Sequence, residues 1–240
     1  MALPLYLAQT RVEMGVNSPA PNFFAYMALH FSASGSGLSN LPESLPPGAM
    51  LILDDSIPIS GHNGDRIVKE LSGLMERHPC ESLLLDFQRP GYPALAELAA
   101  AICQALPFPV GVSELYAQGL NCPVFLSPVP PDRPLHEHLA PWTGRELWLE
   151  AALEGMELTL AENGCTAAPL PDYPGDGMMD ERLHCHYDIR LDSAAHFRLW
   201  RTREDLDRLL QKAESAGVTR AIGLWQELTW NAECKMQNAE

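Results

Sequence analysis

The 240-residue sequence is poor in positive charge. Its 16 Lys and Arg residues stand against 31 Asp and Glu residues, which gives a formal net charge of −15. A protein with this charge repels phosphate backbones and anionic lipid surfaces. We therefore expect neither nucleic acid nor a membrane as a partner.

Long apolar runs and paired cysteines are also missing. No uninterrupted apolar run approaches the roughly 20 residues that a membrane-spanning helix needs. The N-terminal segment MALPLYLAQTRVEM has no basic region ahead of its apolar stretch, which favours a first strand over a signal peptide. The six cysteines form no Cys-x-x-Cys pair, which excludes a zinc knuckle and predicts reduced thiols. We expect a cytoplasmic protein.

Several nucleotide-binding and catalytic motifs are absent. The sequence contains no Gly-x-Gly-x-x-Gly, no phosphate loop and no Gly-x-Ser-x-Gly elbow. Functions that depend on a dinucleotide, a nucleoside triphosphate or a hydrolase elbow therefore have no support. We expect no bound cofactor.

What the sequence does contain is a series of short strand-like segments. Hydrophobic residues make up 46% of the chain, enough to bury a core in one domain spanning 1–240. Eight segments are rich in β-branched, aromatic or leucine residues. They are 3–8, 23–31, 49–54, 82–87, 109–115, 123–127, 146–151 and 220–228.

Helical periodicity separates several of these segments. The clearest helix is predicted over 203–216, with Thr202 and Asp205 as a short capping box and Gly217 as its stop. Two more are predicted over 65–77 and 93–105. Alternating strands and helices with continuously apolar strands are typical of a parallel sheet covered by helices. Eight strands in a chain of this length favour an α/β fold closed into a (β/α)8 TIM-type barrel over an open doubly wound sheet.

One region does not fit the repeating unit. Segments 157–160 and 185–200 resemble extra strands separated by a turn region rich in Pro, Gly and Asp. We interpret 156–200 as a small β-hairpin insertion between the seventh and eighth barrel strands.

Polar side chains recur where the predicted strands end. In a barrel the functional residues lie at the C-terminal ends of the strands, although a solvated rim is also polar. We predict three catalytic candidates, Asp86, Glu114 and Glu227. The candidates for substrate binding are Gln88, Trp225, Asp54 and Asp55.

Alternation along the strands refines two of these positions. Leu84, Asp86 and Gln88 share one face of their strand, which we expect to point into the barrel mouth. Trp225 and Glu227 share a face by the same rule. A Trp beside carboxyl and amide groups suits a sugar, because a pyranose offers an apolar face and several hydroxyls. The alternative is that Trp225 fills the barrel core.

Two segments resemble a known family. Residues 80–88, CESLLLDFQ, resemble the fourth-strand motif D-x-x-D-x-D-x-E of the chitinase-like glycoside hydrolases of family 18. The C-terminal part, 184–228, is similar to the family's ending: a hairpin, a capped helix and a strand with a Trp. The resemblance implies that the motif's Glu protonates the leaving sugar oxygen. It also implies that the preceding Asp orients the substrate's acetamido group, which attacks the anomeric carbon.

The sequence departs from the family motif at the positions that carry the chemistry. Gln88 stands in place of the acidic Glu, and Leu84 stands in place of the middle Asp. The Tyr-Asp expected on the sixth strand is replaced by 123–128, PVFLSP. A neutral amide does not supply a proton. The resemblance therefore implies a degenerate barrel that binds a carbohydrate or similar polar ligand at its C-terminal mouth.

Three alternatives remain open from the sequence. The first is an active glycosidase with a non-standard pair chosen from Asp54, Asp55, Asp86, Glu114 and Glu227. The second is a protein-interaction scaffold that keeps only the barrel.

The third alternative is a metal-dependent hydrolase. His184 and His186 lie two residues apart, on one face of a strand, and His136 and His138 form a second pair. Asp188 and Glu137 would supply oxygen ligands. Solvated surface histidines are the other interpretation of these pairs.

Overall fold

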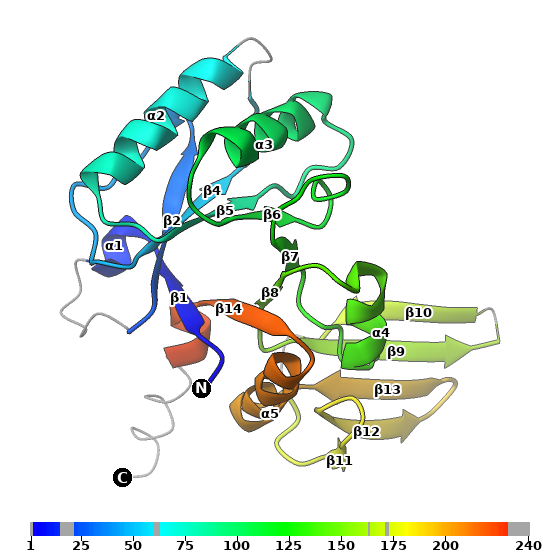
Figure 1. Cartoon of the computed structure of the whole chain (residues 1–240). Coiled ribbons are helices and arrows are strands. Elements are labelled where there is room, and N and C mark those ends of the chain that lie inside the picture. The colour runs from blue at the N-terminus through cyan, green and yellow to red at the C-terminus, as the bar shows by residue number, and fades with distance from the viewer. Residues whose placement is uncertain (1, 15–21, 60–62, 163, 171–172, 230–240) are drawn as a thin grey trace.

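The chain forms a closed barrel of eight parallel strands (Figure 1). The computed structural model describes residues 2–14, 22–59, 63–162, 164–170 and 173–229. The first strand pairs with both the second strand and the last strand, which closes the ring. The barrel strands are β1 (Leu5–Gln9), β2 (Phe24–Phe31), β4 (Met50–Asp54), β5 (Ser82–Asp86), β6 (Val110–Ser113), β7 (Val124–Leu126), β8 (Leu147–Glu150) and β14 (Val218–Leu224). The predicted TIM-type barrel is confirmed.

Three helices of thirteen or fourteen residues cover parts of this barrel. They are α2 (Gly64–Arg77), α3 (Pro93–Ala105) and α5 (Arg203–Ser215), close to the predicted ranges. The predicted capping box is present, because Thr202 Oγ1 accepts from the Asp205 amide and the Asp205 carboxylate accepts from the Thr202 amide. The remaining elements are short: α1 (Arg11–Met14), α4 (Leu135–Leu139), the 3-10 turn η1 (Ala140–Trp142) and β3 (Leu38–Ser39), which is antiparallel to β2.

The apolar residues form two layers. The larger cluster lies between the barrel and its helices, where Leu83 and Leu85 of β5 are fully buried with Leu71 of α2 and Ile102 of α3. Burial of such side chains is the main stabilising contribution in a domain of this size. Leu84, between the two outward leucines, belongs to a second cluster inside the barrel. The predicted inward orientation of Leu84 is therefore correct.

Trp148 of β8 fills the barrel interior at the end where the strands begin. Its ring lies directly against Gly111 of β6, where a side chain would overlap the indole. The Arg220 guanidinium stacks on the Trp148 ring at 4.8 Å and on the Tyr6 ring at 5.5 Å. Such stacking holds a cation over an aromatic face. This group closes the end of the barrel at which the strands begin.

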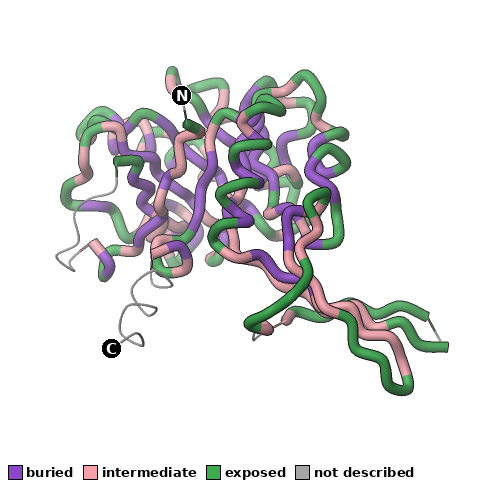
Figure 2. Tube along the Cα trace, turned by 90° about the horizontal axis from the view of Figure 1, so that it is seen from below, coloured by how far each residue is buried: buried purple, intermediate pink, exposed green. Residues whose placement is uncertain are grey.

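Between β8 and α5 the chain forms a second sheet. It is antiparallel and has the strand order β10-β9-β13-β12-β11, so the insertion predicted over 156–200 is a five-stranded sheet and not a hairpin. Its strands are β9 (Gly155–Ala161), β10 (Gly164–Pro169), β11 (Met178–Asp180), β12 (Cys185–Leu191) and β13 (Ala195–Trp200). Figures 1 and 2 show it projecting from the barrel, with mostly exposed and half-buried residues.

Arg201 ties this inserted sheet to the barrel. Its buried guanidinium donates to the carbonyls of Val129 and Pro130, which follow β7, and to those of Leu183 and His184 in the insertion. Each of the three guanidinium nitrogens donates at least one hydrogen bond, which offsets the cost of burying the charge. The base of the inserted sheet is thereby held close to the C-terminal ends of the barrel strands.

Two further observations on the described residues concern the state of the cysteines and the hydrophobicity of the helices. Five cysteines are free thiols, and Cys234 lies outside the described residues. In the ranges given above, no helix has both the length and the apolar character of a bilayer-spanning segment.

Candidate functional site

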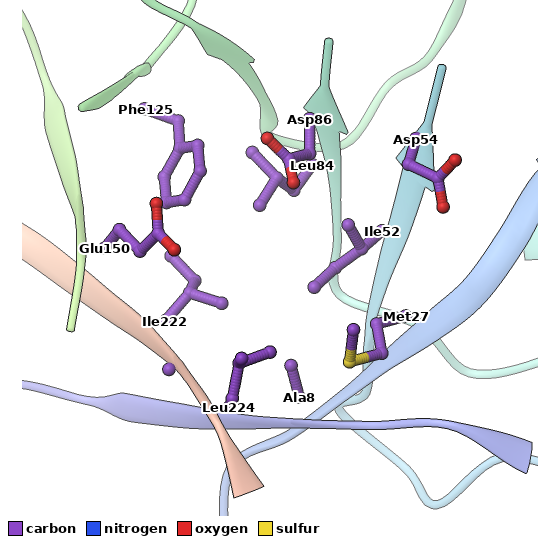
Figure 3. A pocket seen from close by; sticks show the side chains of 11 residues that line it. Ala8, Met27, Ile52, Asp54, Leu84, Asp86, Phe125, Glu150, Ile222 and Leu224 are labelled. Atoms are coloured by element: carbon purple, nitrogen blue, oxygen red, sulfur yellow. The ribbon is translucent and has the colours of Figure 1, made fainter. Parts of the chain in front are cut away.

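A cavity opens inside the barrel where the strands end (Figure 3). We call this cavity and the strand ends around it the mouth. Its volume is about 80 Å³, and three carboxyl groups, those of Asp54, Asp86 and Glu150, contribute to its wall. The rest of the wall is backbone or apolar: Ala8, Met27, Ile52, Leu84, Phe125, Ile222, Gly223 and Leu224. The inward orientation predicted for Asp86 is correct.

The end of β5 is organised by hydrogen bonds. The amide Nε2 of Gln88 donates to Oδ1 of Asp86, so the two predicted site residues are in contact. Asp55 is buried, and its carboxylate accepts from the backbone amides of Gln88 at 2.9 Å and Arg89 at 3.0 Å. Asp55 therefore positions the chain that carries Gln88 and does not line the cavity.

The Asp86 carboxyl has a perturbed acidity. Its burial raises its pKa, and the nearby charges of Asp54 and Asp55 raise it further. The hydrogen bond from Gln88 acts in the opposite direction, because it favours the carboxylate. Asp54 is adjacent to Asp86 in register across β4 and β5, and it accepts from the Ser56 amide at 2.8 Å.

Glu150 at the end of β8 is the most perturbed carboxyl group of the mouth. Its burial, together with the charges of Asp86, Glu154 and Glu227, raises its pKa to about 7. A glutamic acid with this pKa is partly protonated at neutral pH and both donates and accepts hydrogen bonds. The mouth therefore holds two carboxyl groups with raised pKa values, Glu150 from β8 and Asp86 from β5.

The sequence prediction did not include Glu150. Alternation places it on the same face as Trp148, and Trp148 is inside the barrel, so the strand pattern contained a usable signal. The signal is weak because one acidic residue at the end of an apolar strand is also typical of a solvated rim. The raised pKa depends on segments that are distant in sequence, which the strand alone does not reveal.

Glu114 and Glu227, the other predicted catalytic residues, lie outside the cavity wall. Glu114 follows β6 and accepts from the hydroxyl of Ser127 at 2.7 Å. Glu227 accepts from the backbone amide of Leu153, just after β8. Glu227 is still close enough to Glu150 and Glu154 to raise the pKa of both. Each of these two carboxylates holds a loop at the mouth.

A second hollow adjoins these loops. Its volume is about 500 Å³, and it lies between the base of the inserted sheet and the segment that follows β8. Glu154 and Tyr173 contribute polar groups, and the Tyr173 hydroxyl donates to the carbonyl of Leu153. Because Leu153 also bonds to Glu227, the hollow is connected to the rim of the mouth.

Comparison with known proteins gives matches at the level of structure. No protein-family model matches the chain, and no curated protein matches it in sequence. The family 18 chitinase of Cycas revoluta, solved with (GlcNAc)3, superposes with a TM-score of 0.61 at 12% identity, covering 96% of this chain and 97% of that one. The chitinase-like agglutinin of Robinia pseudoacacia gives 0.60 at 12% identity over 94% and 96% of the two chains. The spore cortex-lytic enzyme SleL of Bacillus cereus gives 0.58 at 10% identity over 96% and 74%.

The chain has a chitinase-like barrel fold. In this chitinase-like barrel β5 is the fourth barrel strand in chain order, which is where the resemblance to the family motif places residues 80–88. Asp86 ends that strand and Gln88 follows it.

Trp225 does not lie on the last barrel strand. The prediction extended that strand to residue 228, but β14 ends at Leu224 and residues 225–229 are helical. The strand alternation used to point Trp225 and Glu227 inward therefore does not apply to them. Trp225 is half-buried, is absent from the cavity wall, and follows Leu224, which is part of that wall.

The histidine pairs are engaged in other contacts. His186 Nδ1 lies 2.7 Å from the Asp205 carboxylate, and His138 Nε2 lies 2.9 Å from the Ser127 carbonyl. His184 adopts a left-handed backbone conformation, with φ of 52°. Over the described ranges no group of three or more His, Cys, Asp or Glu side chains is arranged to hold a metal ion.

Proposed function

We propose that the chain is a sugar-binding protein that holds an oligosaccharide at the mouth of its chitinase-like barrel. We also propose that it does not cleave the sugar by the mechanism of family 18. The ligand class is a neutral, hydroxyl-rich oligosaccharide, with N-acetylglucosamine oligomers as the first candidates.

The pairing of Gln88 with Asp86 is the observation that carries this proposal. The amide lies at the position that the resemblance assigns to the proton donor, and its Nε2 group donates to Asp86. A primary amide has no acidic proton at physiological pH, so it orients Asp86 but does not protonate a leaving group. The site keeps polar groups that recognise a sugar and lacks the acid of the family mechanism.

Three solved structures support the ligand class. The Cycas revoluta chitinase is complexed with (GlcNAc)3. A doubly substituted variant of it, with one Glu replaced by Gln, is complexed with (GlcNAc)4 and has a TM-score of 0.60 at 13% identity over 96% of this chain and 97% of that one. The Robinia pseudoacacia protein is a chitinase-like agglutinin. These are properties of those proteins, and they guide the choice of ligand here.

A second candidate function is glycoside hydrolysis by a non-standard carboxyl pair. The pair favoured by the structure is Glu150 with Asp86, because both line one cavity and the raised pKa of Glu150 suits a proton donor. In this case Glu150 would protonate the glycosidic oxygen in place of the family's residue on the fourth strand.

Titration calorimetry with chitotriose, together with a chito-oligosaccharide reporter assay, separates the two functions. The proposal predicts binding by the wild-type protein, loss of binding in Asp86→Ala, and no reporter turnover. Turnover that disappears in both Asp86→Asn and Glu150→Gln would support the second candidate. Glu97→Gln, a change at an exposed residue of α3, is the matched control for the loss of one carboxylate.

A further inference from the structure

The Glu150 carboxyl has no hydrogen-bond or salt-bridge partner among the described residues. It points into the mouth cavity from β8 and Asp86 enters from β5, whereas Asp54 at the end of β4 lines the cavity with its carboxylate turned away from the centre (Figure 3). Asp86 accepts from Gln88, and Asp54 accepts from the Ser56 amide. In the part of the chain that the structure describes, neither a hydrogen bond nor a salt bridge involves the Glu150 side chain, whereas its backbone is paired in the barrel sheet. Its hydrogen-bonding capacity is therefore available to a ligand.

The elements packed around Glu150 contribute apolar groups or acidic groups. β7 contributes Phe125 and β14 contributes Ile222, both part of the cavity wall. The charged groups that act on Glu150 are Asp86, Glu154 and Glu227. None of the residues that line the cavity is Lys, Arg or His.

Two ionised carboxylates that face one cavity repel each other and are poorly solvated. A proton on one of them removes the repulsion and produces a donor beside an acceptor. Asp86 already accepts a hydrogen bond that favours its ionised form, so Glu150 is the group that takes up the proton.

We propose that Glu150 is a specificity-determining residue of the mouth: in its protonated form it donates a hydrogen bond to an oxygen atom of a neutral sugar. This inference rests on the proposed sugar-binding function. It adds that the sugar binds together with one proton, so that deprotonation of Glu150 weakens binding. Asp86 remains the acceptor for a sugar hydroxyl.

The acidity of Glu150 sets the pH range of the effect. With a pKa of about 7, Glu150 is almost fully protonated at pH 5.5 and largely ionised at pH 8.5. If only the protonated form binds, affinity falls about 30-fold between these two values. At pH 7.5 the protein takes up about 0.8 proton on average for each sugar bound, because that fraction of the free protein has Glu150 ionised.

The experiment compares chitotriose binding by wild-type protein, Glu150→Gln and Glu97→Gln at pH 5.5 and 8.5. Gln at position 150 keeps a neutral donor at every pH, so its affinity should stay within about 2-fold of the wild-type value at pH 5.5. The wild type and the Glu97→Gln control should both lose about 30-fold at pH 8.5. Calorimetry of the wild type at pH 7.5 in two buffers of different ionisation enthalpy measures the proton uptake without any variant.

The outcomes separate this inference from the function on which it rests. Wild-type binding that is independent of pH, or a pH dependence that persists unchanged in Glu150→Gln, would overturn the role of Glu150 and leave sugar binding intact. Affinity that rises with pH would also overturn it, because it would mean that the ionised Glu150 carboxylate, as an acceptor, binds the sugar better than the protonated acid does. Absence of binding by the wild type at both pH values would overturn the proposed function itself.

Discussion

The side-chain amide of Gln88 donates a hydrogen bond to the carboxylate of Asp86, so the fourth barrel strand leads into an amide and carboxylate pair. The pair fixes one oxygen of Asp86 and leaves the other free for a ligand. It also keeps Asp86 ionised more than its burial alone would allow. In the proposed function, this contact orients Asp86 toward a sugar and places an amide where the resemblance assigns the acid.

The substitution Gln88→Glu tests whether the missing acid is the only obstacle to catalysis. We expect no cleavage of a chito-oligosaccharide reporter, because Leu84 still replaces the motif's middle Asp and the sixth strand still lacks its Tyr. The new carboxyl should raise the pKa of Asp86 further through like-charge repulsion. Turnover restored by this single change would show that the rest of the machinery is intact.

Removal of the Asp55 carboxylate tests its positioning role. In Asp55→Ala the amides of Gln88 and Arg89 lose their acceptor, and we expect the free energy of unfolding to fall by about 1 to 3 kcal/mol. Chitotriose affinity should fall with it, since Gln88 is no longer held in place. Urea unfolding and calorimetry measure the two effects, with Glu97→Ala as an exposed control. Unchanged stability would mean that Asp55 does not organise the loop.

The raised pKa of Glu150 also predicts a pH-dependent stability. Its pKa rises from 4.5 to about 7 in the folded state, so its contribution to stability is complete below pH 4.5 and is lost as the pH rises to about 7. Gln at this position does not ionise. Urea unfolding should therefore show Glu150→Gln gaining stability relative to the wild type between pH 5 and pH 8, by at most about 3 kcal/mol. Parallel stability curves for the two proteins would contradict the assignment.

Trp225 remains a candidate sugar platform, now at the start of a helical segment. Because the side chain is half-buried, we expect Trp225→Ala to fold normally and to bind chitotriose about 10-fold more weakly. The fluorescence change produced by chitotriose in the wild type should be absent from the variant. A loss of about 3 to 5 kcal/mol in unfolding free energy would indicate a core role instead.

The barrel was predictable because its strands are short apolar runs bounded by turn residues. Leu83, Leu84 and Leu85 illustrate this, since a strand covered on the outside and filled on the inside is apolar on both faces. The end of β14 was not predictable by the same rule. The residues after Leu224 continue to be partly apolar, and hydrophobicity does not distinguish a strand from a short helix.

The inserted sheet and Glu150 show where sequence patterns stop being informative. β10 consists of Gly164–Pro169, small residues that are all exposed and have no apolar alternation, so only pairing with β9 defines it as a strand. The raised pKa of Glu150 comes first from its burial and then from the charges of Asp86, Glu154 and Glu227, of which Asp86 and Glu227 lie far from it in sequence. Asp54 and Asp86, which both line the cavity, were predicted as site residues because each ends a strand.

A crystal structure of the wild-type protein grown with chitotriose at pH 5.5 tests the central claim most directly. The account predicts an uncleaved trisaccharide at the mouth, with sugar oxygen atoms within hydrogen-bond distance of Asp86 and Glu150. An empty mouth with the sugar bound elsewhere, or a cleaved product in the mouth, would contradict it.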